Sequence, residues 1–283
     1  MFHPICATCG TQYETPTPHP QQCPICMDER QYVGWGGQRW TTQDELRRTH
    51  GNRLDDEQGI LCVGMSPAFA IDQRAFVLPT ATHRILWECV PLVTQEAVDR
   101  IRAQGGIDLI AISHPHFYSS MVDWSEALGD VPIYLHEADR EWVGRGSRNI
   151  RLWGGEEHVF SPGVKLIRCG GHFPGSTALH WQDSRRPKGQ LFPGDALQVV
   201  FDRRHVTFMY SYPNAIPLHP DAVRTMRQKI AGLEFDDVFG YTWGRNIIGG
   251  AREAVERSFD RYLRAIGVGS RPASSHSLSL ERQ

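Results

Sequence analysis

Histidine and aspartate residues stand in three short loops where they could hold a metal ion. His114 and His116 follow the apolar run 107–112, and side chains two apart on an extended chain point the same way. His172 follows two glycines and Asp195 follows Gly194, which let a backbone approach a small centre closely. A lone His-x-His pair is commonly a surface or core feature. Three imidazoles and a carboxylate, each beside a predicted strand, suit one divalent transition metal.

Four cysteines near the start form a second candidate metal site. Their spacing is C-x2-C-x13-C-x2-C, and two such turns close a tetrahedral sulfur site around zinc, formed by Cys6, Cys9, Cys23 and Cys26. A segment of this length buries too little apolar area to fold alone, so a structural Zn2+ would be needed to stabilise its fold. Iron with a redox role and four independent thiols are the alternatives. We therefore predict a zinc-ribbon or rubredoxin-like module over residues 1–35.

The bulk composition limits the partners. Of 283 residues, 40% are hydrophobic, and the net charge of -2 creates no field that favours nucleic acid. No apolar run is long enough to span a membrane, and the start lacks the features of a secretory signal. The cysteine count is odd and includes two CxxC pairs, which indicates a reducing compartment. We expect a cytoplasmic protein with a small-molecule substrate; a homo-oligomer is compatible with the sequence.

Strand and helix patterns alternate through the rest of the chain. We predict a linker with one short helix over 36–59, a main domain over 60–268, and a disordered tail over 269–283. Thr94 can cap a helix that buries Ala97, Val98 and Ile101, and Pro220 can begin another. A stripe including Val255 and Phe259 predicts a final helix. This mixture indicates a layered α/β domain.

In register, the three loops resemble the metallo-β-lactamase fold superfamily. "AISHPHFYSS" resembles its TH-x-H-x-DH loop, "CGGHFPGSTALHW" its GHTPGS loop, and "LFPGDALQVV" its GD loop. The resemblance covers roughly residues 60–266. It implies an αββα sandwich with metals at one edge of the two sheets, and the four-cysteine module is not part of that core.

The departures from the family pattern indicate one metal where two are usual. The resemblance implies that the first metal is bound by His114, His116 and His172. Tyr118 and Ser119 replace two ligands of the second metal, and the late loop "FGYTWGRN" lacks the third. The shared Asp195 remains.

One Zn2+ with an open position would activate water and support hydrolysis of an ester, thioester, amide or lactone. Asp195 could orient or deprotonate that water, and Tyr118 could donate a hydrogen bond to an oxyanion or simply fill the vacated volume. A second hypothesis is an Fe2+ oxidoreductase resembling the superfamily's persulfide dioxygenases, which use a mononuclear iron. A third is a non-catalytic protein that binds a ligand or partner.

Further residues are candidates for the substrate pocket, because loops after the GD turn line it in the family. Each has an alternative role in packing, in a strand or in helix capping. They are Ser119, His205, Tyr210, Tyr212, His219, Trp243 and Arg245.

Overall fold

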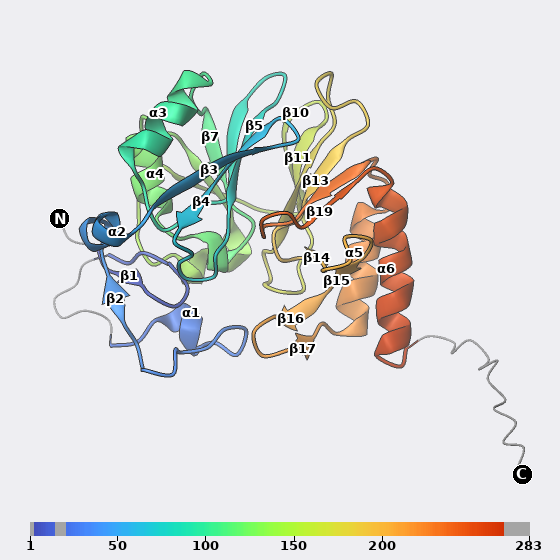
Figure 1. The fold of residues 1–283 in the computed structure, drawn as a ribbon. Coiled ribbons are helices and arrows are strands. Elements are labelled where there is room, and N and C mark those ends of the chain that lie inside the picture. The colour runs from blue at the N-terminus through green and yellow to red at the C-terminus, as the bar shows by residue number, and fades with distance from the viewer. Residues whose placement is uncertain (1–2, 15–20, 269–283) are drawn as a thin grey trace, which may run out of the picture.

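Two mixed β-sheets lie face to face, and helices cover the outer face of each (Figure 1). The computed structural model describes residues 3–14 and 21–268, so the predicted tail lies outside the described residues. The layers form the predicted αββα sandwich. Within the described ranges, no helix combines the length and apolar character needed to cross a bilayer.

The first sheet has seven strands in sequential order. They are β3 (Gly51–Glu57), β4 (Ile60–Ser66), β5 (Ala75–Pro79), β6 (Arg84–Trp87), β7 (Leu109–Ala111), β8 (Ile133–His136) and β9 (Ile150–Trp153). Strand β3 pairs with β4 over its whole length, so the second half of the predicted linker belongs to the main sheet. The sequence did not predict β3, because its residues are mostly polar and half-exposed or exposed.

The second sheet has six strands and begins where the first ends. Its strands are β10 (Glu157–Ser161), β11 (Val164–Arg168), β12 (Thr177–Trp181), β13 (Gln190–Phe192), β18 (Asp237–Phe239) and β19 (Asn246–Ile248). Strands β9, β10 and β19 were not expected, because they are short and carry exposed or half-buried side chains at sheet edges. Two small hairpins extend this half: β14 (Gln198–Val199) with β15 (Val206–Thr207), and β16 (Met209–Ser211) with β17 (Ile216–Pro217).

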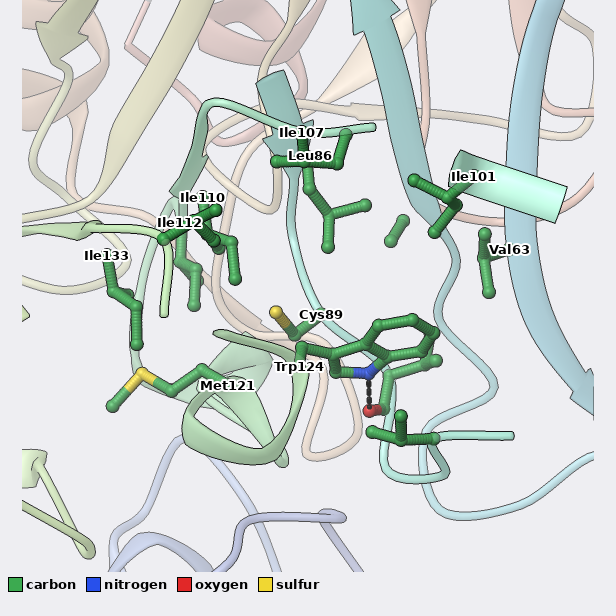
Figure 2. Packing of buried hydrophobic residues seen from close by; sticks show 14 of the residues in the cluster. Val63, Leu86, Cys89, Ile101, Ile107, Ile110, Ile112, Met121, Trp124 and Ile133 are labelled. Atoms are coloured by element: carbon green, nitrogen blue, oxygen red, sulfur yellow. Dashed lines mark hydrogen bonds between the residues drawn. The ribbon is translucent and has the colours of Figure 1, made fainter. Parts of the chain in front are cut away.

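Helices α3 (Gln95–Ala103) and α4 (Met121–Ala127) cover the first sheet, and α5 (Pro220–Ile230) and α6 (Ala251–Ala265) cover the second. The Thr94 hydroxyl accepts a hydrogen bond from the Ala97 amide, which confirms the predicted cap. Figure 2 shows Ile101 of α3 and Trp124 of α4 in the core, with the Trp124 indole donating to the Val90 carbonyl. The segment after β8 is a 3-10 helix, η2 (Glu137–Trp142).

The four-cysteine module packs on one end of the sandwich. It contains β1 (Ile5–Cys6) and α1 (Pro24–Met27), and β1 pairs with β2 (Trp40–Thr41), which lies in the predicted linker before α2 (Gln43–Thr49). The Gln12 amide donates to the Ser119 carbonyl at 3.0 Å, and its side-chain amide donates to Asp123 at 2.7 Å. The module is thus hydrogen-bonded to the segment that follows His116.

Candidate metal centre

The three predicted loops meet at one edge of the sandwich. His114 and His116 lie after β7, where η1 (Pro115–Phe117) begins. His172 lies between β11 and β12, and Asp195 follows β13. One sheet therefore supplies two histidines, and the other supplies a histidine and the carboxylate.

The four side chains bring their donor atoms together. Asp195 Oδ2 lies 3.5 Å from His114 Nε2, 4.0 Å from His116 Nδ1 and 3.8 Å from His172 Nε2. His172 Nε2 lies 3.2 Å from His116 Nδ1. Ligands about 2.1 Å from a tetrahedral zinc are roughly 3.4 Å apart, so this spacing fits one metal ion.

Hydrogen bonds behind the imidazoles set their orientation. His172 Nδ1 donates to the Tyr210 carbonyl at 2.8 Å, because a carbonyl can only accept. His172 Nε2 therefore keeps its lone pair toward the centre. His114 Nδ1 contacts Ser113 Oγ at 2.8 Å, which leaves His114 Nε2 facing Asp195. Hydrogen bonds of this kind commonly fix the tautomer and the ring orientation of metal-binding histidines.

Burial sets the protonation of the centre. It lowers the pKa of His114 to about 4 and, with the neighbouring imidazoles, holds the pKa of His172 well below its ordinary value. Burial would raise the pKa of Asp195, but the adjacent His114 and His116 outweigh it and hold the pKa below its usual range. Neutral imidazoles and an ionised carboxylate are the forms that bind metals.

Unpaired polar atoms also fit a metal. His114 Nε2 and Asp195 Oδ1 are buried and have no hydrogen-bond partner among the described residues. Buried polar atoms without partners are uncommon because each costs about 1–3 kcal/mol. A cation among the imidazoles would satisfy His114 Nε2, and Asp195 Oδ1 would remain available to a water bound beside it.

Glycine makes the approach of the two halves possible. Gly194 has a φ of 54°, and a Cβ there would lie 2.3 Å from Ser113 Oγ and 3.2 Å from Glu88 Oε1. Glu88 is fully buried and its Oε2 accepts from the Ser113 amide at 3.1 Å. Glu88 and Ser113 support the His114 segment; both were missed in the sequence, where a glutamate after an apolar strand gives little signal.

The four cysteines form the second candidate site. Their sulfur atoms all lie within 4.8 Å of one another, with Cys6–Cys26 and Cys9–Cys23 both at 3.6 Å. Sulfurs about 2.3 Å from a tetrahedral zinc are roughly 3.8 Å apart. The Gln38 side-chain amide donates to Cys6 Sγ at 3.2 Å. The donor set and spacing fit a closed structural Zn2+ site.

A cavity of about 320 Å³ opens onto the core centre. His116, His172 and Asp195 lie in its wall, so a ligand could reach the metal position. The predicted pocket residue Tyr212 also lines it, and its hydroxyl donates to the Asp195 carbonyl at 3.1 Å. The sequence did not single out the other lining residues, which are Gln31, Tyr32, Ala70, Ile71, Pro213 and Tyr241.

Tyr118 and Ser119 are turned to other partners. The Tyr118 hydroxyl lies 3.5 Å from the Asp139 carbonyl, and this tyrosine does not line the cavity. Ser119 Oγ accepts from Gln73 Nε2 at 2.7 Å. The placement of Tyr118 supports the alternative of an aromatic that fills volume.

The remaining predicted pocket residues also lie outside the cavity wall. Tyr210 contributes its backbone carbonyl to His172, and its ring lies near Arg30. His205 contacts Asp202 at 2.8 Å in a hairpin turn, and His219 caps α5. Trp243 stacks on Arg53, and Arg245 lies over the exposed Phe201.

Comparison with known proteins gives one clear sequence relative and many structural ones. No protein-family model matches the chain. It is 41% identical over 270 residues to the uncharacterized protein YmaE of Bacillus subtilis (strain 168), covering 94% of this chain and 97% of YmaE.

Among solved structures, VMB-1 aligns with a TM-score of 0.55 at 13% identity, covering 76% of this chain and 98% of VMB-1. The DIM-1 metallo-beta-lactamase aligns with a TM-score of 0.54 at 12% identity, covering 74% and 97%. At this identity the structural likeness concerns the fold. The chain therefore belongs to the family of Bacillus subtilis YmaE, and its fold is that of the metallo-β-lactamases.

Proposed function

We propose that this protein is a mononuclear metal-dependent hydrolase of a small ester, thioester, amide or lactone. The observation that carries the proposal is the group of three histidines and Asp195, whose donor atoms lie within 4.8 Å of one another beside a cavity of about 320 Å³. Such a donor set with an accessible face is typical of catalytic rather than structural metal sites. The superfamily consists largely of metallohydrolases, which also favours an enzyme.

A single metal is supported by the side chains at the second-site positions. Tyr118 and Ser119 face Asp139 and Gln73 instead of the cavity. Among the described residues, the core group of possible metal ligands comprises the three histidines and Asp195. A phenol and a hydroxyl also bind divalent metals poorly at neutral pH.

Two side chains of the cavity can assist hydrolysis. A bound Zn2+ would lower the pKa of its water to about 7 and polarise a substrate carbonyl. Asp195 turns Oδ2 to the imidazoles, so the unpaired Oδ1 can accept a proton from a neighbouring water. The Tyr241 hydroxyl accepts from Gln198 Nε2 at 2.7 Å, so its own proton can be donated to a substrate oxygen.

The same donor set also fits the second candidate function, a mononuclear Fe2+ oxidoreductase. Three imidazoles, one carboxylate and an open face also suit mononuclear Fe2+ that reacts with oxygen. The two candidates differ in the metal they need, so the metal content of the isolated protein separates them.

The test combines metal analysis with two neutral substrates, 4-nitrophenyl hexanoate and γ-hexanolactone. We expect zinc in the core site, and hydrolysis that disappears in His172→Ala while the four-cysteine site keeps its metal. Zinc-loaded protein that is no faster than His172→Ala on either substrate would overturn the hydrolase proposal. Iron in the core site with substrate-dependent oxygen uptake would favour the oxidoreductase.

A further inference from the structure

The four-cysteine module contributes to the wall of the core cavity. Gln31 and Tyr32 follow helix α1 and line the cavity together with His116 and His172. The module lies outside the metallo-β-lactamase-like core, so this wall is an addition to the core.

The core domain holds the main chain on both sides of Gln31. Asn214 Nδ2 donates to the Glu29 carbonyl at 2.9 Å and to the Gln31 carbonyl at 3.0 Å. Ser211 Oγ donates to the Arg30 carbonyl at 3.0 Å. Three hydrogen bonds from the β16–β17 hairpin therefore fix this segment against the metal-binding half.

Arg30 ties the same segment to the third histidine loop. Its Nη1 donates to the His172 carbonyl at 3.3 Å, and its guanidinium lies 3.8 Å from the centre of the Phe173 ring. Arg30 also pairs with Asp28 at 2.6 Å. The positive charge of Arg30 is thus balanced by Asp28, and Arg30 does not line the cavity.

The Gln31 side chain is buried, and its carbonyl oxygen is unpaired within the part of the chain that the structure describes. This residue is only 5% exposed, and its Oε1 has no hydrogen bond among the described residues. Leaving a buried amide oxygen unpaired costs about 1–3 kcal/mol, which a ligand with a complementary polar group would recover. A carboxamide can donate as well as accept, so it suits an uncharged polar group.

The remaining wall is apolar or aromatic. Besides the metal-binding residues, the core domain contributes Ala70, Ile71, Tyr212, Pro213 and Tyr241. Among the described residues, no lysine or arginine lines this cavity, so a substrate carboxylate or phosphate placed away from the metal would lose water without gaining a cation.

We propose that Gln31 is a substrate-positioning and specificity-determining residue that the four-cysteine module supplies, and that the site selects uncharged substrates with an apolar chain. The substrate class rests on the proposed hydrolase function. The contact between Gln31 and a metal-bound ligand can be tested without hydrolysis.

The experiment measures binding of two chelating probes to zinc-loaded protein by calorimetry. Hexanohydroxamic acid has an apolar end, and adipic acid monohydroxamate carries a carboxylate at the same end. Wild type should bind the uncharged probe at least ~10-fold more tightly, because no cation compensates the carboxylate. Gln31→Lys should move the ratio of the two affinities toward the charged probe by about 10-fold or more. Gln22→Lys places the same charge on an exposed position of the module and should leave the ratio unchanged.

The outcomes separate the role of Gln31, the selection of uncharged ligands and the hydrolase function. An unchanged ratio in Gln31→Lys, with zinc content and melting temperature equal to wild type, would overturn the role of Gln31. Equal binding of both probes by wild type would overturn selection for uncharged ligands. If neither probe binds zinc-loaded wild type, the cavity does not serve a metal-bound ligand and the proposal fails. Probe selectivity that depends on Gln31, without hydrolysis of any ester or lactone, would instead overturn only the hydrolase function.

Discussion

At the scale of single residues, the centre depends on side chains whose partners the sequence does not reveal. Three histidines and Asp195 were predicted together from their motifs, and they lie together. Tyr118 stands in the same motif, yet its hydroxyl faces the Asp139 carbonyl. The direction of a side chain after a strand depends on the turn that follows, and here η1 turns the chain.

Replacement of Tyr118 by phenylalanine tests its predicted catalytic role. The hydroxyl makes one long contact of 3.5 Å with a backbone carbonyl, so we expect a loss of at most about 1 kcal/mol in unfolding free energy. The zinc content and kcat should stay within about twofold of wild type. Tyr241→Phe is the comparison, since Tyr241 lines the cavity and should lower kcat. A large loss of kcat in Tyr118→Phe alone would restore Tyr118 as a catalytic residue.

At the scale of elements, the centre requires two sheets to approach through their loops. The Gly194 turn after β13 packs against Ser113 after β7. The contact is so close that residue 194 can carry only a hydrogen atom in place of a side chain. Strand β13 and the His114 segment come from different sheets, so this approach couples Asp195 to the two histidines of the first sheet.

Gly194→Ala should separate the halves of the centre. The added Cβ would meet Ser113 Oγ at 2.3 Å, so the turn must shift and carry Asp195 with it. We expect a loss of about 2–4 kcal/mol in unfolding free energy, because alanine is strained at a positive φ and overpacks the turn. The zinc affinity of the core site should also fall.

Gly106→Ala is the matched control for that change. Gly106 has a φ of 79°, and a Cβ there would meet nothing within 4 Å. The Gly106→Ala variant should lose only about 1 kcal/mol in unfolding free energy, from the strain of alanine at a positive φ, and should keep its zinc affinity. Denaturant unfolding and competition with a zinc chelator measure both quantities; equal zinc affinities in the two variants would contradict the steric argument.

At the scale of the whole molecule, the chain carries two candidate metal sites, one made of imidazoles and a carboxylate and one made of thiols. Burial lowers the pKa of His114 to about 4 and holds the pKa of His172 well below its ordinary value. In the module, contact with Cys23 and burial raise the pKa of the Cys9 thiol well above its ordinary value. Module and core are joined by hydrogen bonds of Gln12 and Arg30, so the cysteine site also shapes the cavity.

Metal binding at the two sites should release different numbers of protons. At pH 7 the imidazoles of His114 and His172 are neutral, because the pH lies above their lowered pKa values, so zinc displaces almost no proton from these two residues. Protonation of His114 should weaken the core affinity only as the pH approaches about 4. A thiol with a raised pKa is protonated at pH 7, so the cysteine site should release at least about one proton per zinc and bind more tightly as pH rises.

Calorimetry of zinc binding in buffers with different ionisation enthalpies measures this release. Cys23→Ser isolates the core site, and His172→Ala isolates the cysteine site, so each variant should bind one zinc. Equal proton release in the two variants would contradict the assigned protonation states.

The sequence by itself determined the two groups of possible metal ligands and the layered fold, because these depend on local spacing, glycine turns and strand periodicity. It also indicated one missing metal position through Tyr118 and Ser119. Only the tertiary structure decided which side chains face the cavity. Gln31 and Tyr32 lie far from Tyr241 in the chain. They meet it through docking of the module and pairing of β18 with β13, and no local pattern records contacts between such distant segments.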